Sequence, residues 1–166
     1  MDAIFRRRSI RKYTDEQVSE ELLEKIIRAG MAAPSAGNEQ PWHFVIINDE
    51  KILKEIPKFH PYSSMLPGVK VAIAVCADLN LQRYEGYWVQ DCSAATQNML
   101  LMADELGLGS VWLGVYPTEE RVIGMKKLLN LPDNIIPFSI LPIGYPGEKK
   151  EPVDRFDKSR IHWNIW

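Results

Sequence analysis

The residues best suited to chemistry lie together near the start of the chain, where residues 6–12 read RRRSIRK. Five of these seven side chains are cationic, whereas the whole chain of 166 residues has a formal net charge of -2. Arginine forks bind phosphate oxygens in pairs, and a serine hydroxyl adds a short neutral donor. The cluster therefore favours a phosphate ligand. A solvated basic face, the usual reading of a charge run, stays open as the alternative.

A second basic cluster with a serine occurs near the other end of the chain. Lys158, Ser159 and Arg160 lie in KKEPVDRFDKSRIHWNIW, a mostly polar segment that also carries aromatic residues at positions 156, 163 and 166. Because a free tail rarely carries large aromatics, we expect this segment to dock on another surface. The two clusters could then close over one phosphate from two sides.

Other kinds of site lack their sequence patterns. The three histidines are far apart and the cysteines have no CxxC spacing, which argues against a metal site. A serine hydrolase would need GxSxG, which does not occur. The chain also lacks GxxxxGK[ST], and its nearest match to GxGxxG, GLGSVWLG, follows a helical pattern and enters a strand, the wrong order for a dinucleotide fold. A phosphate would therefore be bound by side chains.

Composition sets the class of protein. Hydrophobic residues make up 46% and charged residues 25%, a globular balance that predicts one domain over residues 1–166. The near-neutral charge argues against non-specific nucleic-acid binding, so a nucleic-acid binder would have to use RRRSIRK alone. We find no signal-peptide pattern or membrane-length apolar run, and we expect Cys76 and Cys92 to be buried thiols. These features favour the cytoplasm and no membrane partner.

The first half of the chain must position the basic cluster. Apolar residues recur at helical spacing over residues 20–31, preceded by Ser19 as a cap. The segment PSAGNEQP at residues 34–41 reads as a loop. It is followed by a predicted strand at 43–48, a helix at 50–56 and an irregular, proline-rich stretch at 57–67.

The second half predicts a central helix between buried strands. VKVAIAVCAD, residues 69–78, is an apolar run typical of a strand covered on both faces. A broad apolar helix follows at about 86–106, then a strand at 110–116, a helix at 118–129 and a strand at 135–145. Alternating strands and helices predict an α+β fold of the α/β sandwich type, with a mixed central β-sheet flanked by helices.

Several segments together resemble the nitroreductase family of flavoproteins. They are RRRSIRKY, APSAGNEQPWHF, DCSAATQNMLLMADELGLGSVWLG and DKSRIHW, in the order the family has them and over nearly the whole chain. The resemblance implies FMN as cofactor, an intertwined homodimer with an exchanged C-terminal tail, and a two-electron reductase. On the opening motif it places Arg7, Arg8, Ser9 and Arg11 on the flavin, with Arg7 and Ser9 toward the phosphate. Arg11 would lie near the pyrimidine end, where its charge stabilises the anionic reduced ring.

The remaining motifs of the resemblance supply further flavin contacts. The PSAGNEQPW loop implies Pro34, Ser35, Ala36, Asn38 and Gln40, some of them contacting the FMN of the partner subunit. The WLG element implies Leu113 and Gly114 beside the ring, with a backbone N–H toward flavin N5, and the tail implies Lys158 and Arg160 at the phosphate. The residues alone leave simpler readings open: Asn38 and Gln40 as turn residues, and Gly114 as a strand bulge.

The resemblance also implies a reaction. NAD(P)H would reduce the flavin and leave, and a flat acceptor such as a nitroaromatic or a quinone would take the electrons in a ping-pong cycle. Because water can supply the proton, no catalytic side chain is predicted. The alternative is a module that stores, senses or delivers FMN without turnover. Four aromatics could wall the substrate cavity or pack in the core: Tyr62, Tyr84, Tyr87 and Trp88.

Overall fold

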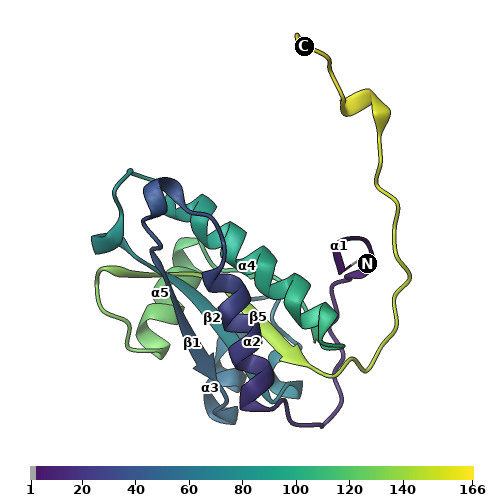
Figure 1. Ribbon diagram of the computed structural model, residues 1–166. Helices are drawn as coiled ribbons and strands as arrows, with labels where there is room; N and C mark the ends of the chain where they lie inside the picture. Colours follow the sequence, from purple (N-terminus) through teal and green to yellow (C-terminus); the bar gives the residue numbers. More distant parts are fainter. Residues whose placement is uncertain (1–2) are drawn as a thin grey trace.

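The computed structural model describes residues 3–166 and places helices on both faces of a central sheet (Figure 1). The sheet order is β1 (Trp42–Ile47), β2 (Val71–Asp78), β5 (Ile135–Gly144) and β3 (Gly109–Ser110), with β4 (Leu113–Gly114) also paired to β5. The paired strands run antiparallel, and the parallel pairing recorded among the described residues is the isolated bridge between Ser9 and Ser110. The α+β class with a helix-flanked sheet is confirmed.

Strand β2 shows why the sheet is covered twice. Its residues at odd positions from Val71 to Ala77 pack with α2 (Glu20–Met31) and α4 (Trp88–Glu105), which lie against each other. The residues at even positions from Ala72 to Cys76 pack in a second core with α3 (Glu50–Glu55) and α5 (Glu119–Leu128). A strand with apolar side chains on both faces is stable only between two such layers. The continuous apolar run predicted this arrangement correctly.

Both cysteines belong to these cores. Cys76 and Cys92 are free and fully buried. Burial raises the pKa of the Cys76 thiol to about 12 and raises that of Cys92 as well. Both are therefore protonated thiols at neutral pH, as expected from the sequence.

The ends of the elements follow local chemistry. The Ser19 side chain accepts the Leu22 N–H and begins α2, and Gly107 with φ of 76° follows the end of α4. Helix α4 begins at Trp88, two residues later than predicted. A short helix that the sequence did not predict, α1 (Ala3–Arg6), lies beside the end of α4.

The predicted strand at 110–116 is wrong as one element. Its residues form the short strands β3 and β4, which pair with β5 in a single register and are separated by Val111 and Trp112. In that register Val111 lies opposite Pro142, which has no N–H to donate to the ladder. The hydrogen bonding therefore breaks at this point, and the ladder resumes at Leu113.

The C-terminal segment leaves the body of the molecule. Residues 151–166 are exposed throughout and extend away from the sheet, with one short 3-10 turn at Lys158–Arg160 (Figure 1). Trp163 is 84% and Trp166 98% exposed. The docking expected for this tail is therefore not made within one chain. Among residues 3–166, no helix has the length and apolar character needed to cross a membrane.

Candidate functional site

The N-terminal basic segment is attached to the sheet at β3. Ser9 forms a bridge with Ser110, and the Ile10 N–H donates to the Ser110 carbonyl at 3.0 Å. Ile10 itself is buried against Gly109. This attachment brings Arg11 next to the segment 112–114, although about a hundred residues of sequence separate the two.

Arg11, Leu113 and Gly114 share one cavity of about 450 Å³. The other residues that line it come mainly from the proline-rich stretch and from the first turn of α5: His60, Pro61, Tyr62, Ser64, Met65, Trp112 and Arg121. Three residues predicted from two separate motifs therefore meet at one place. No sequence motif indicated His60 or Arg121, because the contacts that bring them here depend on the packing of α5 against the sheet.

The Gly114 carbonyl is held by two donors. His60 Nε2 and Arg121 Nη1 each lie 2.9 Å from it. Since the partner of His60 is a carbonyl, Nε2 must carry the proton and donate it. Burial and the nearby Arg121 charge lower the pKa of His60 overall, so the ring is neutral. The backbone at Gly114 is therefore fixed by two side chains from different elements.

Gly114 borders open space on the side where a side chain would project. Apart from its two chain neighbours, no atom of residues 3–166 lies within 4 Å of a Cβ built on it, and its φ lies outside the left-handed region. Neither backbone conformation nor packing within the chain therefore requires glycine at this position. The open space in front of it fits the face of a planar group such as a flavin, which main chain can approach closely only where no side chain intervenes.

The cavity is also positively charged. Arg11 and Arg121 both line it, and none of its lining residues is acidic. The Arg121 guanidinium lies 5.3 Å from the centre of the exposed Tyr62 ring, which helps to hold it in place. Of the four aromatics considered as cavity walls, Tyr62 lines this cavity, whereas Trp88 is a core residue that packs edge-on against Tyr116 and Phe138.

The arginines before Ser9 lie at the end of α4. The pKa of the partly buried Arg7 is lowered, chiefly by burial and also by the positive charges of Arg155 and Arg8. The negative charge of Asp104 acts in the opposite direction and raises this pKa. Arg8 donates to the Glu151 carbonyl at the base of the tail. Cations grouped in this way favour an anionic ligand. Arg6 is exposed and pairs with Asp104 at 2.9 Å and Glu105 at 3.2 Å.

The PSAGNEQP loop lies at the opposite end of α4. The Ala36 N–H donates to Asp91 Oδ1 at 2.9 Å in the first turn of that helix, and Gln40 Nε2 donates to Asn38 Oδ1 at 2.9 Å. Asp104, which pairs with Arg6, comes thirteen residues after Asp91 in the same helix, a rise of about 20 Å. The structure therefore separates Pro34, Ser35, Ala36, Asn38 and Gln40 from the Arg7–Ser9 cluster within one chain.

The predicted tail residues are also separate from the cavity. Lys158 and Arg160 lie in the exposed segment, where Arg160 pairs with its neighbour Asp157 at 3.1 Å. One chain therefore does not bring the two basic clusters together. Sequence reasoning missed two buried acidic residues, Glu39 within the loop and Asp91 in α4 beside it. The only signal for Glu39 was an acid inside a motif of small and amide residues, and Asp91 had none.

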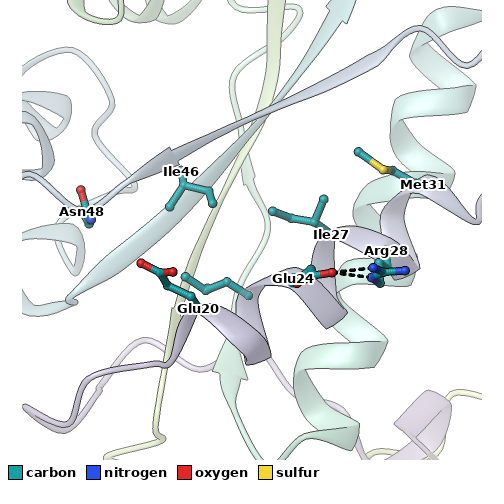
Figure 2. Close-up of a pocket in the computed structure, with 8 residues that line it drawn as sticks. Glu20, Glu24, Ile27, Arg28, Met31, Ile46 and Asn48 are labelled. Carbon is teal, nitrogen blue, oxygen red and sulfur yellow. Dashed lines mark hydrogen bonds and ion pairs between the residues drawn. The ribbon is translucent and has the colours of Figure 1, made fainter.

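A larger groove of about 720 Å³ lies between α2 and β1, and it contains none of the predicted site residues. Figure 2 shows its mixed character: Ile27 and Met31 of α2 lie beside the ion pair of Glu24 and Arg28, whose closest atoms are 2.6 Å apart, and Ile46 comes from β1. Helix α2 and the edge strand β1 thus leave apolar side chains uncovered. The size of this groove does not make it the reactive site, because its two acids, Glu20 and Glu24, are exposed and Glu24 is already paired with Arg28.

Comparison with known proteins agrees with this geometry. The family model described as the Nitroreductase family matches residues 4–64 and 61–145. A candidate NADH dehydrogenase/NAD(P)H nitroreductase of Methanothermobacter thermautotrophicus is 51% identical over 100% of this chain and 87% of its own length. The solved FMN-dependent nitroreductase of Clostridium difficile is 29% identical, with a TM-score of 0.92 and 99% of both chains covered.

A second solved structure contains the cofactor itself. The nitroreductase candidate from Desulfovibrio desulfuricans, described as a complex with FMN, is 34% identical with a TM-score of 0.85, and the match covers 99% of this chain and 95% of that one. The family model spans most of the described residues, including the cavity at Arg11 and Gly114. This chain belongs to the nitroreductase family.

Proposed function

We propose that the protein is an FMN-dependent oxidoreductase that transfers two electrons from NAD(P)H to flat acceptors such as nitroaromatics and quinones. The observation that carries the proposal is the cavity in which Arg11, Leu113 and Gly114 meet. These residues come from two motifs far apart in the sequence, and both motifs resemble flavin-binding segments of the family. Relatives with names such as FMN reductase [NAD(P)H] from Bacillus subtilis, 29% identical over 93% of this chain, support the choice of donor.

The residues of the cavity suit a flavin ring. FMN, when bound, would supply the two-electron chemistry. Gly114 leaves room for the ring, and His60 and Arg121 hold its carbonyl so that the backbone stays in place. Arg11 and Arg121 provide positive charge that stabilises the anionic reduced ring. None of the lining residues is a carboxylic acid, so a proton for the product would come from water.

The phosphate would lie near Arg7, Arg8 and Ser9. Arg7 is destabilised in its charged form by burial and by Arg155 and Arg8, and a phosphate dianion would relieve this repulsion. The cost of grouping the arginines is then offset by the ligand. The same electrostatics gives the cluster a preference for FMN over riboflavin, which has no phosphate.

The loop at 34–40 supports a dimeric site. It lies about 20 Å along α4 from the arginine cluster, so in one chain it is at the wrong end of the helix to share a flavin with Arg7. A second copy of the chain, packed with its α4 in the opposite direction, would bring its loop to the first copy's cavity. The exposed aromatics of the tail would find a surface in the same assembly. We therefore include a homodimer with exchanged tails in the proposal.

The visible spectrum of the purified protein tests this function. The proposal expects a yellow protein that retains FMN, whose flavin band bleaches when NADH or NADPH is added without oxygen and returns when a quinone is added. A colourless protein that does not bind added FMN would contradict the flavin site. A yellow protein that neither nucleotide bleaches would favour the alternative of an FMN store or carrier.

A further inference from the structure

Two buried carboxyl groups face each other beneath the PSAGNEQP loop. Glu39 is 6% exposed and Asp91 is 4% exposed, and their carboxyl groups are within hydrogen-bonding reach of each other. Each has one oxygen, Glu39 Oε1 and Asp91 Oδ2, that is buried without a hydrogen-bond partner among residues 3–166. Two carboxylates cannot both remain ionised in such a place without strong repulsion, whereas one proton between them would satisfy both unpartnered oxygens.

The other two oxygens accept three backbone N–H groups from two segments of the chain. Asp91 Oδ1 accepts the Ala36 N–H of the loop at 2.9 Å. Glu39 Oε2 accepts the N–H groups of Arg83 at 2.7 Å and Tyr84 at 3.1 Å, in the segment before α4. A proton shared by Glu39 and Asp91 would therefore complete a chain of hydrogen bonds from Ala36 through both acids to Arg83 and Tyr84.

The loop needs such a support because its backbone is strained. Asn38 and Gln40, on either side of Glu39, have φ of 57° and 47°, values that ordinary residues rarely adopt. Gly37 has φ of 51°, and a Cβ there would lie 2.4 Å from the Tyr84 ring. Residues held in this way persist only where surrounding contacts fix them, and they gather at functional sites. Between residues 34 and 40, Glu39 is the one residue that is buried, and its carboxylate accepts hydrogen bonds that fix the loop.

The charges around the pair set its response to pH. The titratable groups that face it are Arg83 from the segment before α4 and the thiol of Cys92 in α4. Burial and Glu39 raise the pKa of Asp91 to about 6, although the Ala36 N–H works against this rise. The hydrogen bonds from Arg83, Asp91 and Tyr84 lower the pKa of Glu39 in spite of its burial. Asp91 is thus the acid that keeps the proton.

We propose that Glu39 and Asp91 share one proton and act together as positioning residues, holding the strained loop in the conformation that presents Asn38 and Gln40 to a flavin. The hydrogen bonds of Ala36, Arg83 and Tyr84 to the two acids anchor the loop to α4. The effect of this loop on a flavin rests on the proposed function. When the shared proton is lost, the two carboxylates repel each other and the loop loosens. The stability of the loop's conformation, and the affinity for any ligand that the loop contacts, therefore falls as the pH rises.

The sign of the stability effect follows from the raised pKa. An unfolded aspartate titrates near 3.9, so the stabilising effect of the proton is complete below that value and is lost as the pH rises through about 6. A shift of about two units corresponds to as much as a hundredfold change in the unfolding equilibrium constant.

The variant Asp91→Asn isolates the proton. An asparagine amide can accept the Ala36 N–H through its oxygen and donate to Glu39 through its nitrogen at every pH, without a change of volume. Glu85→Gln, an exposed acid in the same stretch of chain, is the matched control. Thermal unfolding and amide hydrogen exchange at Ala36, Arg83 and Tyr84 are measured on the flavin-free protein between pH 5 and 8. FMN affinity is measured separately by fluorescence titration.

The proposal expects the wild type and Glu85→Gln to lose exchange protection at these three amides, beyond the intrinsic pH effect, as the pH rises through the titration of the pair. Asp91→Asn should keep its protection and unfold at a temperature several degrees above that of the wild type at pH 8. Its FMN affinity should change less than twofold over a range in which that of the wild type falls tenfold. If exchange protection were equal in the wild type and in Asp91→Asn at both pH 5 and pH 8, the proposal of a shared proton would be wrong. A loop that responds to pH while FMN affinity does not would overturn its role toward the flavin, and loss of FMN binding by all variants would contradict the proposed function instead.

Discussion

The imidazole of His60 donates from Nε2 to the Gly114 carbonyl at 2.9 Å, so a residue of the proline-rich stretch fixes the strand that borders the candidate flavin site. His60 is 1% exposed, and its Nδ1 has no partner among the described residues. The sequence predicts an irregular stretch at 57–67, yet this stretch contains His60, whose hydrogen bond holds β4 in place. Its prolines break regular structure, and tertiary contacts rather than a repeating pattern decide where His60 points.

The substitution His60→Leu should lower the free energy of unfolding by about 1–2 kcal/mol at pH 7, because a buried hydrogen bond is lost while Arg121 keeps the carbonyl partly satisfied. The lowered pKa of His60 means that its neutral form stabilises the folded state above about pH 6.5 and that this effect is lost as the pH falls. The destabilisation measured by urea unfolding should therefore be smaller at pH 5. His43→Leu, at a half-exposed site, serves as the control and should change stability by less than about 0.5 kcal/mol. An equal loss in both variants would contradict the role assigned to His60.

Gly114 and Gly109 should respond in opposite ways to alanine. Gly114→Ala adds a methyl group into open space, so the flavin-free protein should keep its stability within about 0.5 kcal/mol, while FMN retention drops at least tenfold. Gly109→Ala would place Cβ 2.8 Å from an Ile10 methyl group and should cost roughly 1–3 kcal/mol by overpacking. Thermal unfolding with and without FMN distinguishes the two. Unchanged FMN affinity in Gly114→Ala would remove the main argument for a ring at this position.

Most of the fold follows from periodicity, because long amphipathic or apolar runs have only one way to be buried. The run around Val75 and the helix through Met99 were predicted for this reason. The break between β3 and β4 was not, since it depends on Pro142, which lies about thirty residues away and comes opposite Val111 only through the register of β5. Local sequence cannot show such a pairing.

The site was predicted unevenly for a related reason. Arg11 and Gly114 were found because their motifs resemble those of a known family, and the structure brings them together. Arg121 was missed because its place in the cavity comes from the orientation of α5 and from the Gly114 carbonyl. The loop residues such as Asn38 remain predictions, since one chain does not bring them to the cavity. Whether they reach a flavin depends on a second copy.

Alanine variants of Arg7 and Arg6 should differ in their effects: the first should weaken FMN binding, and the second should not. Arg7→Ala removes a cation that its neighbours already repel, so the flavin-free protein should be unchanged or slightly more stable, while FMN affinity falls at least tenfold. Arg6→Ala breaks exposed ion pairs with Asp104 and Glu105, which solvent screens, and should change stability little without affecting FMN. Fluorescence titration with FMN and with riboflavin measures the difference. If Arg7→Ala weakened both ligands equally, the phosphate would not be its partner.

Arg121 should influence the flavin through its charge. Arg121→Met keeps much of the side-chain length but removes a cation from a cavity without acidic lining residues, so the reduction potential of bound FMN should become more negative. Arg121→Lys should recover part of the change, because it restores the charge without the planar fork. Spectroelectrochemical titration of the three proteins provides the measurement. A potential that is the same in all three would place Arg121 in a structural role at Gly114 only.

The tail should be required for assembly. Phe156, Trp163 and Trp166 are 74%, 84% and 98% exposed in one chain, and large aromatics near the centre of an interface often contribute about 2 kcal/mol or more to association. Removal of residues 153–166 should therefore convert a dimer into a monomer in analytical ultracentrifugation and abolish FMN retention, because the loop of the second copy is lost with it. Trp163→Ala should weaken the dimer, whereas Ile123→Ala, an exposed apolar residue on α5, should not. A truncated protein that remains dimeric would show that the α4 face alone holds the copies together, and one that is monomeric yet retains FMN would place the whole flavin site within a single chain.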